Sequence, residues 1–129
     1  MKISPTSPLV LGDKITDGGN TFTGYAADVT NLGDVSVFLE QSLKLDGIEA
    51  APHRIYTYRY KGSGGGINEN FDSDGDDGVG LRLLKAMRDE KILNRIWTVT
   101  GLCGPDYHHI GKTRFSHARQ VCNNANLKL

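Results

Sequence analysis

Residues 72–115 read DSDGDDGVGLRLLKAMRDEKILNRIWTVTGLCGPDYHHIGKTRF, and this stretch decides the fold class. After an acidic glycine loop, apolar residues recur about every four positions from Val79 to about Lys91, as on one stripe of an amphipathic helix. Arg95 to Thr100 is rich in β-branched residues, which favours a strand. Apolar spacing predicts a last helix over Thr113 to Asn124. The stretch therefore reads as loop, helix, strand and helix.

The upstream half supplies further strands and one more helix. Thr21 to Val29 and His53 to Lys61 have strand composition. Between them a helix is predicted from about Leu32 to Gly47, and a glycine-rich connection then contains one short strand, Ile67 to Phe71. The order β, α, β, short β, α, β, α predicts an α+β domain. We expect a two-layer α/β sandwich with a mixed four-stranded sheet and helices on one face.

The chain has 129 residues, the size of one domain. We expect a flexible segment over residues 1–12, which contain Pro5 and Pro8, and one domain over residues 13–129. Its two cysteines are more typical of free thiols than of a disulfide framework, which indicates a reducing compartment. The N-terminal apolar run is too short for a signal or a membrane span. These features predict a cytoplasmic monomer without membrane contact.

The formal charge of zero conceals an asymmetry along the chain. Residues 1–78 carry a net charge of about minus six, and residues 79–129 carry about plus six. Such a division can create a basic face for phosphate or for an acidic protein. In a compact fold the two halves can instead neutralise each other, and we favour this second interpretation.

No catalytic or cofactor motif is complete. Gly111-Lys112-Thr113 resembles the end of a phosphate loop, but the glycine needed five residues earlier is Asp106. The acidic loop has calcium-loop character, yet Leu81 stands where a bidentate Glu is needed, so an Asp N-cap at Asp76 or Asp77 is the simpler interpretation and a weak cation site stays open. We therefore predict no enzyme activity and no cofactor.

Cysteines and histidines also fail to form a recognisable metal or catalytic set. Their spacing matches no zinc signature, and Cys122 lies on the apolar stripe of the last predicted helix. The residues that we considered are Cys103, His108, His109, His117 and Cys122. We predict no metal site.

One strand carries a row of aromatic side chains. Tyr56, Tyr58 and Tyr60 share a face with Arg54, an arrangement that can stack unpaired bases. A cross-strand ladder, in which the tyrosines contact side chains of neighbouring strands, is the alternative that we favour, because Tyr is common in strands. Basic residues at the start of the last helix would add phosphate contacts.

Several short segments follow one another in a particular order. They are Asn20-Thr21-Phe22, Asp28-Val29, Pro52 to Arg59, Asp74-Gly75-Asp76, Arg82-Leu83-Leu84, Ile96 to Thr100, Gly104, and Ile110 to Phe115. This ordered set resembles the IMPACT family. Two departures are Asp76, where the family usually has Glu, and a longer turn containing His108-His109.

The resemblance implies an α/β sandwich like those of ribosomal-protein and elongation-factor domains. It also implies a non-enzymatic domain in translational control that binds a protein partner or the ribosome, within the kinase response to amino-acid starvation. We expect only the conserved domain, without the family's N-terminal partner-binding domain. RNA binding is the alternative. The predicted binding residues are Arg54, Tyr56, Tyr58, Arg59, Asp74, Asp76, His108, His109, Lys112 and Arg114.

Overall fold

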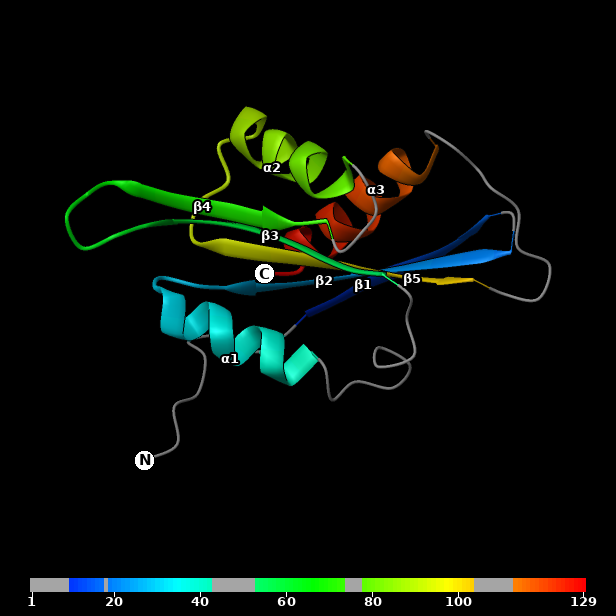
Figure 1. Cartoon of the computed structure of the whole chain (residues 1–129), viewed down its shortest axis with the longest axis horizontal. Helices are drawn as coiled ribbons and strands as arrows, with labels where there is room; N and C mark the ends of the chain where they lie inside the picture. The colour runs from blue at the N-terminus through cyan, green and yellow to red at the C-terminus, as the bar shows by residue number, and fades with distance from the viewer. Residues whose placement is uncertain (1–9, 18, 43–52, 74–77, 104–112) are drawn as a thin grey trace.

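The computed structural model describes residues 10–17, 19–42, 53–73, 78–103 and 113–129. Figure 1 shows the arrangement of the eight elements in these ranges. They are β1 (Val10–Asp17), β2 (Asn20–Asp28), α1 (Leu32–Ser42), β3 (His53–Lys61), β4 (Ile67–Asp72), α2 (Val79–Asp89), β5 (Arg95–Cys103) and α3 (Thr113–Leu127).

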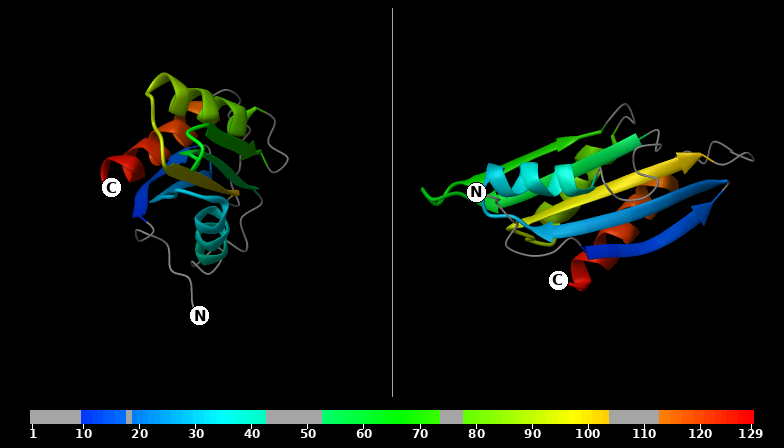
Figure 2. Two further views of the ribbon diagram at one scale, coloured as in Figure 1. Left: turned by 90° about the vertical axis from the view of Figure 1, so that its left-hand side faces the viewer. Right: turned by 90° about the horizontal axis from the view of Figure 1, so that it is seen from below.

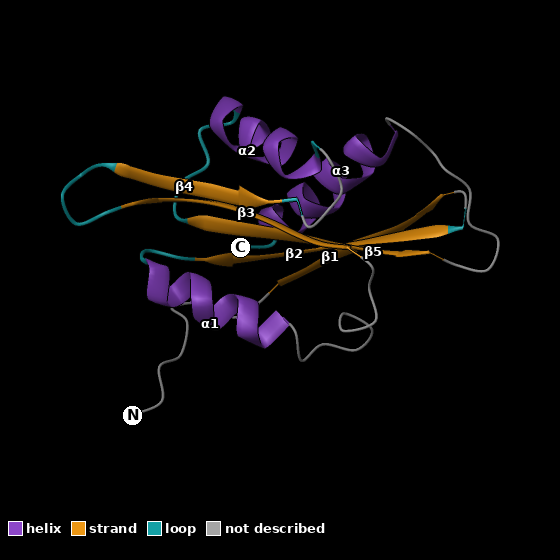
Figure 3. Ribbon diagram, in the orientation of Figure 1, coloured by secondary structure: helices purple, strands orange, loops and turns teal. Residues whose placement is uncertain are grey.

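The strands form one five-stranded sheet in the order β1-β2-β5-β3-β4, and every neighbouring pair is antiparallel (Figure 3). The central strand β5 pairs Thr100 with Thr23 of β2 and Thr98 with Tyr56 of β3. The α+β class is confirmed. The prediction of a mixed four-stranded sheet is wrong, because β1 adds a fifth strand and no described pair is parallel.

Helices cover both faces of the sheet, which Figure 2 shows from two further directions. In β2, Ala26 packs into the core under α2 and α3, whereas Tyr25 and Ala27 pack into a second core with α1. This alternation follows from the two-residue repeat of a strand. The prediction that all helices lie on one face is therefore wrong.

The space on the sheet explains this difference. Five strands about 4.8 Å apart span roughly 20 Å, which is room for only two helices at their usual separation of about 10 Å. Helix α3 lies over β1 and β2 and α2 lies over β3 and β4, so α1 takes the opposite face. In this strand order, crossovers β2-α1-β3 and β4-α2-β5 of the same hand would place α1 and α2 on the same face of the sheet. Because α1 and α2 lie on opposite faces, the two crossovers have opposite hands.

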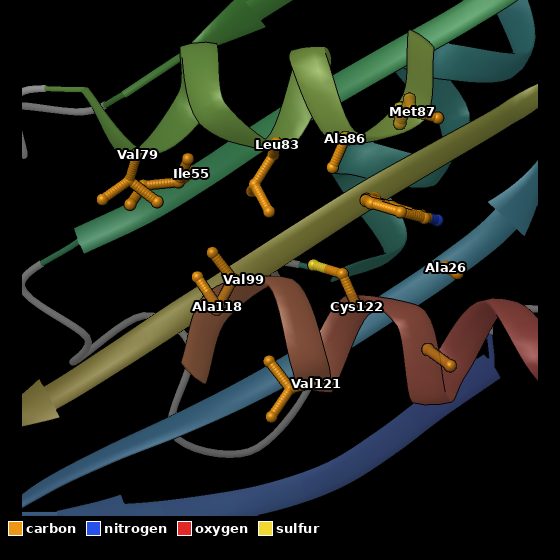
Figure 4. Close-up of a cluster of buried hydrophobic side chains, with 12 residues drawn as sticks. Ala26, Ile55, Val79, Leu83, Ala86, Met87, Val99, Ala118, Val121 and Cys122 are labelled. Atoms are coloured by element: carbon orange, nitrogen blue, oxygen red, sulfur yellow. The ribbon is translucent and has the colours of Figure 1, made fainter. Parts of the chain in front are cut away.

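The larger core lies between the sheet and the pair α2 and α3. Figure 4 shows Leu83 of α2 and Cys122 of α3 directed toward Val99 of β5. Trp97 is fully buried at the centre of β5, and its indole N–H donates to Asn126 Oδ1 at 3.2 Å. The apolar stripes predicted for the second and third helices are confirmed as the buried faces of α2 and α3.

Two element boundaries differ from the sequence prediction. Strand β1 begins at Val10 and so includes residues 10–12, which we had assigned to a flexible segment. Helix α2 has Gly78 as its N-cap, with a φ of 89°, and no side chain caps it at that position. Instead, Ser73 Oγ accepts a hydrogen bond from the Gly80 N–H at 3.1 Å. The predicted cap, Asp76 or Asp77, lies outside the described residues.

Candidate binding surface

The tyrosine row of β3 has mainly a structural role. Tyr58 and Tyr60 are buried beside α1, at 8% and 7% exposure. Their rings stack with centroids 5.8 Å apart, and Tyr56 stacks on Tyr58 at 6.3 Å. The hypothesis of an open stacking row is wrong for Tyr58 and Tyr60, whose faces pack inside the protein. The three rings stack on one another along β3, whereas the predicted ladder ran across to the neighbouring strands.

Tyr56 and Arg54 lie at the open end of the same face. Tyr56 is half-buried. Partial burial is the main cause that raises the pKa of its hydroxyl, and the nearby charge of Asp72 raises the pKa further. Asp72 is the cross-strand neighbour of Tyr56 in β4. Arg54 is exposed beside Thr100 in the register. Of the predicted stacking row, only Arg54 and Tyr56 are accessible at the surface, and the neighbouring carboxylate of Asp72 would repel a phosphate group.

Arg59 lies on the opposite face and holds the end of α2 in place. Its Nε donates to Glu69 at 2.9 Å, and its guanidinium donates to the carbonyl of Ile92 at 3.1 Å and to that of Met87 at 3.4 Å. The Met87 carbonyl also accepts the backbone N–H of Ile92 at 2.9 Å, so Arg59 adds a second hydrogen bond to it. Arg59 therefore ties β3 to the C-terminal end of α2 and to the residues just beyond it, and its guanidinium is engaged within the protein.

Glu69 joins two arginines at this point. The Arg88 Nε donates to Glu69 at 3.0 Å from the outer side of α2. The hydrogen bond from Arg88 is the main cause that lowers the pKa of the Glu69 carboxyl, and Arg59 lowers it further against the effect of burial. The carboxylate thus links β3, β4 and α2.

A partly exposed cluster of different composition lies where the first turns of α2 and α3 meet, with Arg82 exposed and Arg114 and Phe115 half-buried. The guanidinium carbon of Arg82 lies 4.1 Å from the centre of the Phe115 ring, and that of Arg114 lies 4.4 Å from it. Gly78 brings the α2 backbone to the same ring, since a Cβ at that position would lie 3.7 Å from two of its carbons. We call Gly78, Arg82, Arg114 and Phe115 the Phe115 cluster.

This cluster unites two of the sequence motifs that carry the family resemblance. Arg82 begins the segment Arg82-Leu83-Leu84, and Arg114-Phe115 ends the segment that starts at Ile110. Arg114 is one of the predicted binding residues, whereas Arg82 and Phe115 are not. Their place in two of the family segments was a signal that could have identified them, but their contact depends on α2 and α3 sharing one face of the sheet.

Ion pairs neutralise part of the charge asymmetry of the chain. Arg95 pairs with Asp28, Arg88 with Glu69, and His117 with Asp17 when the histidine is protonated. Arg119 approaches Glu90 at 3.7 Å. The remaining exposed cations of α2 include Arg82 and Lys85, and no carboxylate in the described part of the chain pairs with either. Positive charge therefore remains at the Phe115 cluster.

The described residues show little that suggests catalysis. They contain no group of His, Cys, Asp and Glu side chains arranged to hold a metal ion. Cys122 is buried, burial raises the pKa of its thiol, and its Sγ lies 3.8 Å from the Thr98 carbonyl. Such a thiol is inert, because the thiolate is the reactive form. Asp74, Asp76, His108, His109 and Lys112 lie outside the described residues.

No helix in the described ranges has the length and apolar character needed to cross a membrane. The described elements define a small α+β domain. The family model for the Impact N-terminal domain matches residues 19–126, and the chain belongs to this family. The predicted resemblance to the IMPACT family is confirmed.

Individual relatives agree with this assignment. The chain is 32% identical over 126 residues to the Protein IMPACT homolog of Saccharomyces cerevisiae, covering 94% of this chain and 48% of that protein. It is 34% identical over 76 residues to the Protein IMPACT homolog of Dictyostelium discoideum, covering 59% of this chain and 22% of that protein. The chain therefore spans less than half of these two relatives.

A solved structure described as the two-domain translational regulator Yih1 has a similar fold. The TM-score is 0.67 at 27% sequence identity, and the match covers 98% of this chain and 49% of the other. The match includes nearly the whole of this chain, so the overall arrangement of strands and helices is shared.

Proposed function

We propose that this chain is a non-enzymatic binding domain that acts in translational control through a protein partner. The main observation behind this proposal is the Phe115 cluster, in which residues from two distant family motifs meet at a partly exposed position. The description of the similar Yih1 structure as a translational regulator supports the biological process. Arginine and phenylalanine are both enriched at protein interfaces, and arginine also at binding hot spots.

More specifically, we propose that the protein partner belongs to the response to amino-acid starvation. We propose that the domain contacts either the ribosome or the large activator of the general-control kinase, and so damps that response. Both partners would be met in the cytoplasm. In this proposal the domain acts by occupying a surface that another protein needs.

Co-sedimentation with purified ribosomes and a pull-down with the purified kinase activator test this proposal. We expect association with at least one of them at 50 mM salt. The sample must show a single cooperative melt, so that a negative result reports on the folded protein. Absence of association with both partners would overturn the proposal.

RNA binding is the alternative function, and the structure weakens it. Only Arg54 and Tyr56 of the predicted stacking row are accessible, and Asp72 is next to Tyr56 in the sheet. Titration of single-stranded RNA at two salt concentrations decides the matter, because phosphate contacts make affinity fall steeply with salt. Tight, salt-sensitive binding that is lost in Tyr56→Ala would favour the alternative.

A further inference from the structure

We propose that the Phe115 cluster, together with Lys85 and Leu81, is a docking site for an acidic segment of a protein partner. This inference rests on the proposed function in taking the partner to be a protein. It adds the position of the site and the chemistry of the ligand. The occupant is a short stretch of chain that presents carboxylates and at least one apolar side chain.

The geometry holds two guanidinium groups close together. Both lie over one ring, so their carbons cannot be farther apart than the sum of 4.1 Å and 4.4 Å. Planar guanidinium groups bind carboxylates through paired N–H donors, and stacking on an aromatic ring fixes the plane of the donors. The ring therefore orients the guanidinium of the exposed Arg82 for recognition of an anionic group.

The local electrostatics favour an external anion. Arg82 and Arg114 lie near the N-terminal ends of α2 and α3, where the helix dipoles already create positive potential. Cations at this end of a helix oppose the dipole and add nothing to helix stability. Lys85 lies one turn beyond Arg82 and is exposed. A ligand carboxylate would pair with Arg82 and Lys85, neither of which has a carboxylate partner in the described part of the chain.

An acidic protein segment fits the site better than a nucleic acid does. Arg82 and Lys85 are only one helical turn apart, whereas non-specific nucleic-acid binding depends on a longer track of phosphate contacts. The Phe115 ring is covered by guanidinium groups, and Tyr58 and Tyr60 are buried beside α1 on the other face of the sheet. Stacking of bases therefore has no open platform here.

Leu81 gives the site an apolar contact. It is 38% exposed and immediately precedes Arg82 in α2. It lies four residues before Lys85, which places the two side chains on one side of the helix. A segment that alternates acidic and apolar residues would satisfy both kinds of contact.

Fluorescence anisotropy with defined probes tests this site. The first probe is a labelled ten-residue glutamate peptide containing one leucine, the second is its glutamine counterpart, and the third is a ten-nucleotide uridine RNA. The proteins are wild type, Arg82→Ala, Arg82→Lys and Lys14→Ala. Lys14 is an exposed cation on β1 that pairs in register with Thr23, on the face opposite α2 and α3, so its variant is a control for charge alone.

We expect the wild type to bind the glutamate peptide at 50 mM salt and to bind the glutamine peptide much more weakly. Arg82→Ala should lose about tenfold in affinity, as expected for one charge-assisted contact. Arg82→Lys should lose a similar factor, because it keeps the charge but not the planar donors. Lys14→Ala should stay within about twofold of the wild type, as a rim charge far from the ligand does.

Three results would overturn this inference. The first is the absence of peptide binding by the folded wild type. The second is an equal effect of Arg82→Ala and Lys14→Ala on peptide affinity. The third is tighter binding of the RNA than of the peptide, with the RNA affinity lost in Arg82→Ala. In each case an intact association with ribosomes or the kinase activator would leave the proposed function standing, so failure of this inference and failure of the proposed function are distinguishable.

Discussion

Adding one methyl group at Gly24 should disrupt the contact between α3 and the sheet. A Cβ at this position of β2 would lie 2.4 Å from the carbonyl carbon of Val121, 2.5 Å from its oxygen and 2.7 Å from the Cys122 nitrogen. These are backbone atoms of a helix, and they cannot move away by changing a rotamer. Gly24→Ala therefore requires the whole of α3 to shift.

Opposing contributions set the size of the effect. Overpacking a well-packed core costs typically about 1 to 3 kcal/mol. Replacing glycine by alanine also lowers the conformational entropy of the unfolded chain, which stabilises the folded state by about 0.4 to 1 kcal/mol and partly offsets this cost. Because the clash involves backbone on the helix side, we expect the upper part of the range. The net loss in the free energy of unfolding should be about 2 kcal/mol.

Urea denaturation followed by circular dichroism measures this change. Gly101→Ala is a matched control, because a Cβ on that residue of β5 would meet nothing within 4 Å and its φ is not positive. The control should be equal to the wild type or more stable by up to about 1 kcal/mol. Equal stabilities of Gly24→Ala and the wild type would show that α3 does not lie against β2 as described.

Three further predictions concern the two ends of α2. Because the folded-state pKa of Glu69 is lowered, its contribution to stability is present above the unfolded pKa of about 4.3 and is lost as the pH falls through the folded value. Urea midpoints between pH 3 and 6 should therefore fall more steeply for the wild type than for Glu69→Gln, and identical slopes would contradict this. Lys91 has a φ of 57° just after α2, so Lys91→Gly should raise the free energy of unfolding by about 0.5 to 1 kcal/mol in urea denaturation, whereas a loss would show that Lys91 makes a compensating contact. Phe115→Ala should cost about 1 to 3 kcal/mol in thermal melts, less than a fully buried phenylalanine, and a cost above 4 kcal/mol would place the ring in the core.

Local patterns were sufficient to predict most of the elements. Strand β3 has the predicted bounds, His53–Lys61, because tyrosines and β-branched residues strongly favour a strand. Helix α2 begins at the predicted Val79, since its apolar stripe is clear. Strand β1 was missed because Gly12, Asp13 and Lys14 interrupt its apolar character.

The reason for that glycine lies in a distant helix. A Cβ on Gly12 would lie 2.3 Å from the Val121 carbonyl oxygen of α3. No pattern within β1 reveals a helix that follows it by about a hundred positions. The same limitation applies to the second face of the sheet, because the placement of α1 depends on the space already taken by α2 and α3.

Arg59 illustrates a signal that the sequence did contain. It alternates with Tyr58 and Tyr60 along β3, so it must point to the other face. Its grouping with a tyrosine binding row was therefore inconsistent with strand geometry. Its true partners could not be inferred, because Glu69 and the Ile92 carbonyl reach it only after β4 and α2 are in place.

The position of the Phe115 cluster follows from the same topology. Arg82 and Phe115 are far apart in the sequence, and they meet because α2 and α3 lie side by side on one face while α1 occupies the other. Glu69 and Arg59 hold the C-terminal end of α2, and Gly12 and Gly24 let α3 lie close to β1 and β2. The buried contacts thus fix both helices, and the separation of the two arginines is set by the core and not by the surface residues themselves. Docking of the proposed partner at a position held by the core in this way would carry a lower entropic cost than docking at an unsupported surface loop.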